Sequence, residues 1–111
     1  MKIKEFTDNL LAERLTTHFD SQKLVDWGVE MIKNGYESEN ILILAGLDSD
    51  TTEEKEKYFW KSLDDLDIEI DKTDFELLEN YARLIANRVM FKELSPIKGL
   101  AIMQGIINAS E

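Results

Sequence analysis

The sequence has little of what most catalytic sites are built from: no cysteine, one histidine, one proline and five glycines among 111 residues. Without cysteine there can be no disulfide, no thiolate nucleophile and no cysteine metal site. The five glycines form neither a dinucleotide loop nor a phosphate loop. His18 is the single histidine, and one titrating group by itself specifies no reaction. These absences predict a protein that is not an enzyme and needs no cofactor.

Long hydrophobic runs are also absent. The longest apolar run is Ile41 to Leu47, which is far shorter than a membrane span. The first residues, Met1 to Glu5, contain no apolar segment of signal-peptide length. We therefore expect a cytoplasmic protein that does not bind membranes, and nothing in the sequence specifies its oligomeric state.

Charge of one sign dominates a single stretch of the chain. Residues 48–79 contain 13 acids and four bases, a net charge of −9, whereas the other 79 residues contain 10 acids and nine bases, a net charge of −1. This concentration predicts a negative surface, which would steer a basic protein partner toward it. Binding of a nucleic-acid backbone is not expected, because that requires a basic surface.

Apolar residues recur at helical spacing along the whole chain, and the breaks carry helix-capping residues. The pattern predicts an all-α fold: one domain over residues 1–111, a bundle of about six helices with antiparallel helical hairpins. A buried strand at Ile41–Leu44 is the alternative for the third helix, but no second strong strand candidate exists to pair with it. The predicted helices run from Ile3 to about Phe19, from Asp20 or Ser21 to Asn34-Gly35, from Ser38 to Gly46, from Thr51 or Thr52, from Thr73 or Asp74, and from Ser95-Pro96.

The last two helices carry clear apolar stripes, which are expected to face the core. Three glycines inside helical patterns, Gly28, Gly99 and Gly105, are expected to allow close packing of helices. The stripe of the fifth helix comprises Phe75, Leu78, Ala82, Ile85 and Val89, and that of the sixth comprises Ile97, Leu100, Ala101, Gln104 and Ile107.

The segment from Asp65 to Glu76 places carboxylates at ligand positions 1, 3, 5, 7 and 12 of an EF-hand loop. Position 6 of that loop turns sharply and requires glycine, but Ile70 occupies it. Leu66, Ile68 and Ile70 instead resemble apolar residues that dock a linker onto the core. The segment therefore predicts no specific metal site.

Trp60 is the strongest candidate for a partner-binding residue. It lies at the edge of the fourth helix's apolar stripe, with Glu56 and Asp64 four residues away on either side. An aromatic residue framed by carboxylates suits a basic partner, although packing in the core is an alternative role. The candidate partner-binding residues are Trp60, Asp64, Asp65, Asp67 and Asp71.

Two stretches carry a resemblance to known proteins. One is WGVEMIKNGY (27–36), which continues through SEN to Leu47; the other is YARLIA (81–86) followed by LSPIKGL (94–100). Over roughly residues 24–107 they resemble small, acidic, helical bacterial proteins of uncharacterised function, some of which look like immunity proteins encoded beside toxins. The resemblance implies a helical fold and a bacterial cytoplasm, and its motifs mark helix ends rather than chemistry.

These observations support one main hypothesis, an acidic protein that inhibits a basic protein partner, as immunity proteins do. A structural or assembly module without specific activity is the first alternative. A protein that mimics DNA by presenting carboxylates in place of phosphates is the second. The salt dependence of binding distinguishes these hypotheses. Binding through carboxylates, whether in inhibition or in DNA mimicry, weakens with salt because salt screens charge attraction, whereas assembly through an apolar surface does not.

Overall fold

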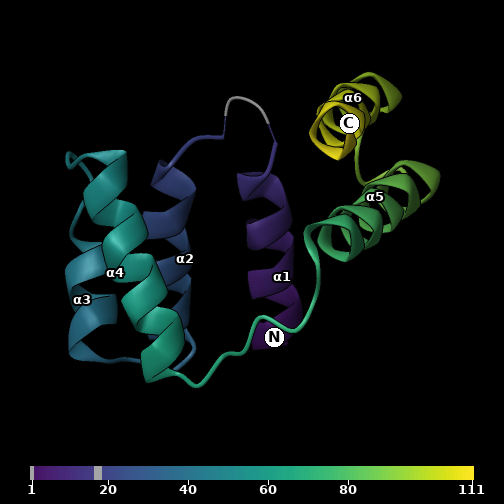
Figure 1. Cartoon of the computed structure of the whole chain (residues 1–111). Coiled ribbons are helices and arrows are strands. Elements are labelled where there is room, and N and C mark those ends of the chain that lie inside the picture. Colours follow the sequence, from purple (N-terminus) through teal and green to yellow (C-terminus); the bar gives the residue numbers. More distant parts are fainter. Residues whose placement is uncertain (1, 17–18) are drawn as a thin grey trace. The chain divides into compact units, whose positions relative to one another are not determined.

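The computed structural model describes residues 2–16 and 19–111, so His18 lies outside the described residues. In this part of the chain the fold is all-α, with six helices and no strand, as predicted (Figure 1). The helices are α1 (Ile3–Arg14), α2 (Gln22–Lys33), α3 (Glu39–Ala45), α4 (Thr52–Asp65), α5 (Asp74–Met90) and α6 (Pro96–Ser110). None of them combines the length and the apolar character that crossing a membrane requires.

The helices begin where short polar side chains cap them. Ser38 accepts a hydrogen bond from the backbone N–H of Ile41 at 3.2 Å, and Thr51 accepts one from Glu54 at 3.2 Å. Thr73 and Glu76 form a reciprocal capping box at the start of α5. These caps confirm the predicted starts of α3, α4 and α5, because capping depends only on residues three positions apart.

The beginning of α6 and the end of α2 are also as predicted. Ser95 accepts a hydrogen bond from the backbone N–H of Lys98, and Pro96 takes the first helical position, where no N–H is needed. Gly35 has a positive φ of 85° directly after Asn34, which ends α2 in the left-handed conformation that favours glycine.

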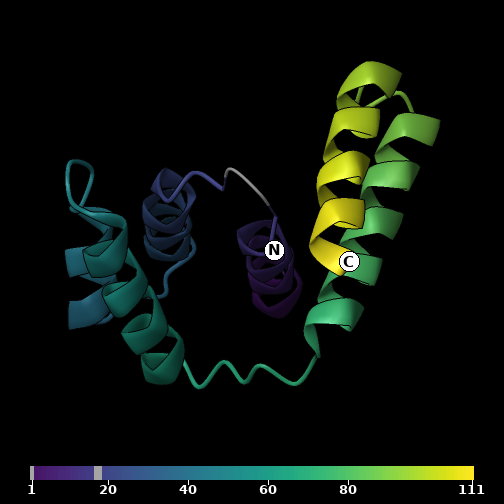
Figure 2. The same ribbon diagram turned by 45° about the horizontal axis from the view of Figure 1, so that its top comes forward.

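The chain divides into two units, which are described separately. The first comprises residues 2–4 and 20–70, and the second comprises residues 5–16, 19 and 71–111. In the first unit α2, α3 and α4 pack against one another (Figure 1). In the second unit α5 and α6 form an antiparallel hairpin (Figure 2). The single domain expected from the sequence stays a prediction.

The core of the first unit is aromatic at its centre. Trp27 and Phe59 are fully buried, and their rings meet edge to face with centroids 5.0 Å apart. Gly28 allows α3 to approach α2, since a Cβ at this position would lie 3.3 Å from the side chain of Leu44. The other buried apolar residues of this unit are Leu24, Val25, Met31, Ile41, Leu44 and Leu63.

The second unit buries one stripe of α5 and only a narrow strip of α6. Gly99 is needed there, because a Cβ at this position would overlap Cγ2 of Val89. Gly105 has only an ordinary contact, 3.9 Å from Cβ of Thr16, so the predicted need for glycine is confirmed at Gly99 but not at Gly105. The buried apolar residues of this unit are Leu10, Leu11, Ala12, Leu77, Leu78, Tyr81, Ile85 and Ile106.

Three details differ from the sequence prediction. The first helix ends at Arg14 rather than near Phe19, because the hydroxyl of Thr16 donates to the Glu13 carbonyl at 2.6 Å and so competes with the helical pattern. Phe75 is exposed rather than buried. The stripe predicted for α6 is exposed too, and Gly99 and Ile106 face inward instead. The α6 prediction was wrong because the helix is apolar on nearly every side, so its pattern does not indicate which side packs.

Candidate functional site

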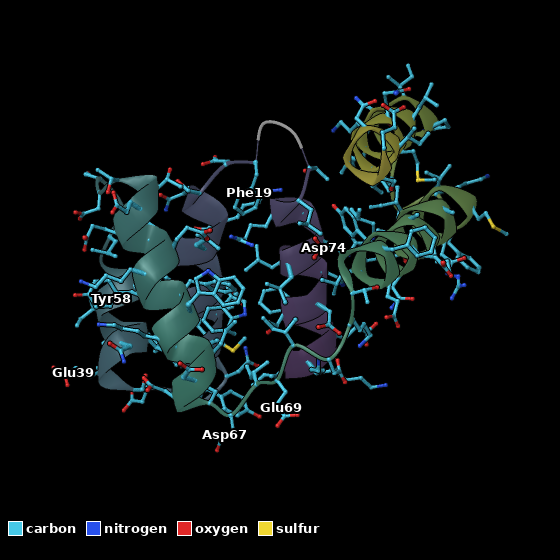
Figure 3. The ribbon with its side chains drawn as sticks, viewed as in Figure 1. Phe19, Glu39, Tyr58, Asp67, Glu69 and Asp74 are labelled. Atoms are coloured by element: carbon cyan, nitrogen blue, oxygen red, sulfur yellow. The ribbon has the colours of Figure 1, made fainter. Side chains whose placement is uncertain are left out.

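Three carboxylates gather where α4 ends. Asp64 and Asp65 are the last two residues of the helix, and Asp67 follows after a single residue. All three side chains are exposed. Figure 3 shows Asp67 pointing away from the ribbon at the end of α4. We call Asp64, Asp65 and Asp67 the α4 acidic end.

The turn that holds Asp67 is a Schellman motif, in which backbone N–H groups beyond the helix bond to its last free carbonyls. The N–H of Asp67 donates to the carbonyl of Asp64 at 3.1 Å, and the N–H of Ile68 donates to the carbonyl of Leu63 at 3.0 Å. Asp67 has a φ of 54°, a conformation in which a residue with a Cβ is strained relative to glycine. At the equivalent position the chain has Gly35 after α2 and Lys92, with a φ of 60°, after α5. An acid therefore occupies a position where glycine would be more stable.

The charge of the α4 acidic end also opposes the helix dipole. The C-terminus of a helix carries a partial negative charge, so bases stabilise its last turn and acids destabilise it. The helices α1, α2 and α5 follow this rule with Arg14, Lys33 and Arg88 in their last turns. The last turn of α4 contains no base and two aspartates. The dipole and the carboxylates together concentrate negative potential at this point.

Asp65 is held in place by residues at the start of α3. The amide of Asn40 donates to its carboxylate at 3.0 Å. Hydrogen bonds from the side chains of Ser38 and Asn40, and more weakly the positive charge of Lys61, lower the pKa of Asp65 below its ordinary value. Asp65 therefore remains ionised in mildly acidic solution, with its carboxylate fixed rather than freely rotating.

Trp60 is half-buried, so it is neither a fully exposed partner-binding residue nor a fully buried core residue. Its ring packs edge to face on Phe59, with centroids 5.5 Å apart, so one part of it belongs to the aromatic core. Because it precedes Asp64 by one helical turn, the remaining surface lies on the same side of α4 as this acid. The side chain can thus serve as a rigid apolar contact beside the carboxylates.

Asp71 does not join the other four candidates in one unit. It falls in the second unit, whereas Trp60 and the α4 acidic end belong to the first. Its carboxylate lies 3.6 Å from Nζ of Lys72, which also donates to Asp8 at 2.8 Å. The hydrogen bond to Asp8 and the nearby charge of Asp71 raise the pKa of Lys72. A cation therefore balances part of the charge at Asp71. Its role in partner binding stays a prediction, and the other four candidates share the first unit.

Sequence reasoning missed the residues that shape this surface from a distance. Asn40 contacts Asp65 from 25 residues away, and no local pattern indicates such a pair. On α4, Nζ of Lys57 and Nζ of Lys61 lie 5.3 and 5.2 Å from the centre of the Tyr58 ring. These two lysines lie within three residues of Tyr58 on the same helix, so unlike Asn40 they are visible in the local sequence.

No group of three or more potential metal ligands occurs within residues 2–16 and 19–111. The acids between Asp65 and Glu76 extend over the end of α4, the connecting segment and the start of α5. Comparisons with protein-family models, with curated proteins and with solved structures found no match. The chemistry of the surface itself is therefore the basis for a functional assignment.

Proposed function

We propose that the protein binds a basic protein partner through the α4 acidic end and Trp60. One observation carries this proposal: three acids occupy positions where both the helix dipole and, at Asp67, the backbone conformation disfavour them. Local stability rules are most often broken where a surface serves a function.

The binding would use two properties of the surface. The concentrated negative potential raises the association rate with a basic partner, and the effect falls as salt is added. The exposed part of the Trp60 ring then supplies an apolar contact that loses water on binding and slows dissociation. Asp65 contributes a carboxylate already fixed by Asn40, so little side-chain entropy is lost when it pairs.

The concrete form that we propose is inhibition. A small acidic protein that covers the basic surface of a toxic enzyme prevents that surface from reaching its own ligand. This form follows the expectation drawn from the sequence, in which residues 24–107 resemble proteins that look like toxin immunity proteins.

Two matched variants test the surface. Asp64→Asn with Asp67→Asn removes two charges from the α4 acidic end, and asparagine tolerates the positive φ of position 67. Glu53→Gln with Glu54→Gln removes two charges from the first turn of the same helix and serves as the control. The wild-type chain and both variants are used at low salt to capture partners from a lysate of the source cells.

We expect the wild type and the control to retain the same basic protein and the Asp64/Asp67 variant to lose it. The association rate measured with that partner should fall steeply as salt rises. Equal retention by all three chains, or an association rate that is independent of salt, contradicts the proposal.

A further inference from the structure

The second unit exposes apolar residues on both helices of its hairpin. In α6, 14 of the 15 residues are uncharged and Lys98 is the exception. A helix that is apolar on all sides is normally buried all round. Nevertheless Leu100 and Ile107 on α6, and Phe75 and Met90 on α5, are exposed.

These exposed residues share one face of the hairpin. On α5, Tyr81 is on the side toward α1, where its hydroxyl bonds to Glu13, and Val89 is on the side toward Gly99 of α6. At 3.6 residues per turn, Phe75, Ala86 and Met90 form a stripe beyond Val89, on the side away from Tyr81.

The sides of α6 can be assigned in the same way, from its contacts and the helical repeat. Gly105 faces Thr16, which follows α1, and Gly99 faces Val89 of α5. Leu100 and Ile107 lie beyond Gly99, on the side away from Gly105. Both stripes are therefore on the side of the hairpin opposite α1, and the antiparallel helices place them next to each other (Figure 2). We call Phe75, Ala86, Met90, Leu100 and Ile107 the outer face of the hairpin.

The outer face is large enough for a stable contact. Phe75, Met90, Leu100 and Ile107 are 65%, 74%, 73% and 52% exposed. They present roughly 600 Å² of side-chain surface, close to the approximately 800 Å² that each partner buries in an interface of standard size. Apolar surface of this extent is at the upper end of what monomers expose and often serves an interaction.

Charge indicates what covers this face. Residues 74–111, which include both helices of the hairpin, contain four bases and five acids, a net charge of −1 within a chain of net charge −10. Glu79 and Arg83 lie on the same side of α5 as the stripe, and they neutralise each other because Arg83 donates to Glu79 at 2.5 Å. Because the hairpin is nearly neutral, a strongly acidic chain can approach a copy of itself here with less charge repulsion than through its other surfaces. A basic partner finds no excess of acid on this face.

We propose that the outer face binds the same face of a second copy of this chain. Two helical hairpins that meet through an apolar face form a four-helix bundle, and a two-fold axis makes the interface self-complementary. The interface would involve α5 and α6, so it is independent of the α4 acidic end. Because it is apolar, added salt should not dissociate it, whereas binding at the acidic end weakens with salt.

Sedimentation equilibrium of the full chain, over concentrations from about 10 to about 500 µM, tests this inference by mass action. We expect the wild type to reach twice the mass of one chain. Leu100→Glu on α6 and Ala86→Glu on α5 should each return the mass to that of a monomer, because each places two buried carboxylates in a symmetric interface. Leu42→Glu is the matched control, since Leu42 is an exposed leucine of α3 in the first unit.

Circular dichroism of each variant verifies that helix content is retained, which is expected because all three substituted residues are exposed. A wild type that remains monomeric throughout the concentration range overturns the inference, whether another protein or nothing covers the face. A dimer that survives both Leu100→Glu and Ala86→Glu, or that Leu42→Glu also abolishes, overturns it as well.

Discussion

Replacing Gly99 and Gly105 in turn by alanine should change stability in opposite directions, although both residues lie in α6. A methyl group at Gly99 overlaps Cγ2 of Val89, whereas at Gly105 the nearest atom is Cβ of Thr16 at 3.9 Å. Valine is stiff about χ1, so Val89 cannot rotate away at little cost.

The size of the effect follows from two opposing terms. Alanine is more favourable than glycine inside a helix by about 1 kcal/mol. Overpacking typically costs about 1–3 kcal/mol, and this term applies only at Gly99. Gly105→Ala should therefore raise the free energy of unfolding by about 0.5–1 kcal/mol, and Gly99→Ala should lower it by about 1 kcal/mol.

Urea denaturation followed by circular dichroism measures both changes. Both substitutions affect the second unit, so their comparison does not depend on how the two units couple. The double variant Val89→Ala/Gly99→Ala removes the overlap, so its loss of stability should be smaller than the sum of the two single losses. If Gly99→Ala is as stable as Gly105→Ala, the close contact of α5 and α6 at this point is refuted.

Three further substitutions test other parts of the structure. Asp67→Gly should raise the free energy of unfolding by roughly 0.5–1 kcal/mol, because glycine adopts the positive φ of 54° without strain. The same substitution should weaken partner binding. An unchanged free energy of unfolding in urea would contradict the proposed backbone strain at Asp67. Burial and the nearby Glu13 raise the pKa of Tyr81 above its ordinary value of 10. The folded state thus favours the neutral phenol, so the contribution of Tyr81 to the free energy of unfolding is fully present below pH 10 and declines as the pH rises further. Tyr81→Phe should remove this part of the decline. Parallel curves of stability against pH for the wild type and the variant would refute the raised pKa of Tyr81. Thr73→Ala removes the capping box with Glu76 and should cost about 1 kcal/mol in a thermal melt, whereas an unchanged melting temperature would show that the cap contributes nothing.

The sequence by itself determined the helices and most of their ends. Ser38, Thr51, Thr73 and Ser95 begin helices because each caps a backbone N–H only three residues further along the chain. The acidic stretch was equally visible, since composition alone gives its charge.

Only the tertiary structure decided which sides of these helices are covered. Asp65 is fixed by Asn40, 25 residues away, and Trp60 is half-buried because its ring packs on Phe59. Asp71 belongs to a different unit from the acids that precede it, although the sequence shows one continuous run of charge. The exposed side of α6 is the clearest case. Periodicity identifies a buried side only when a polar side contrasts with it, and α6 lacks that contrast, so packing against Val89 determined its orientation.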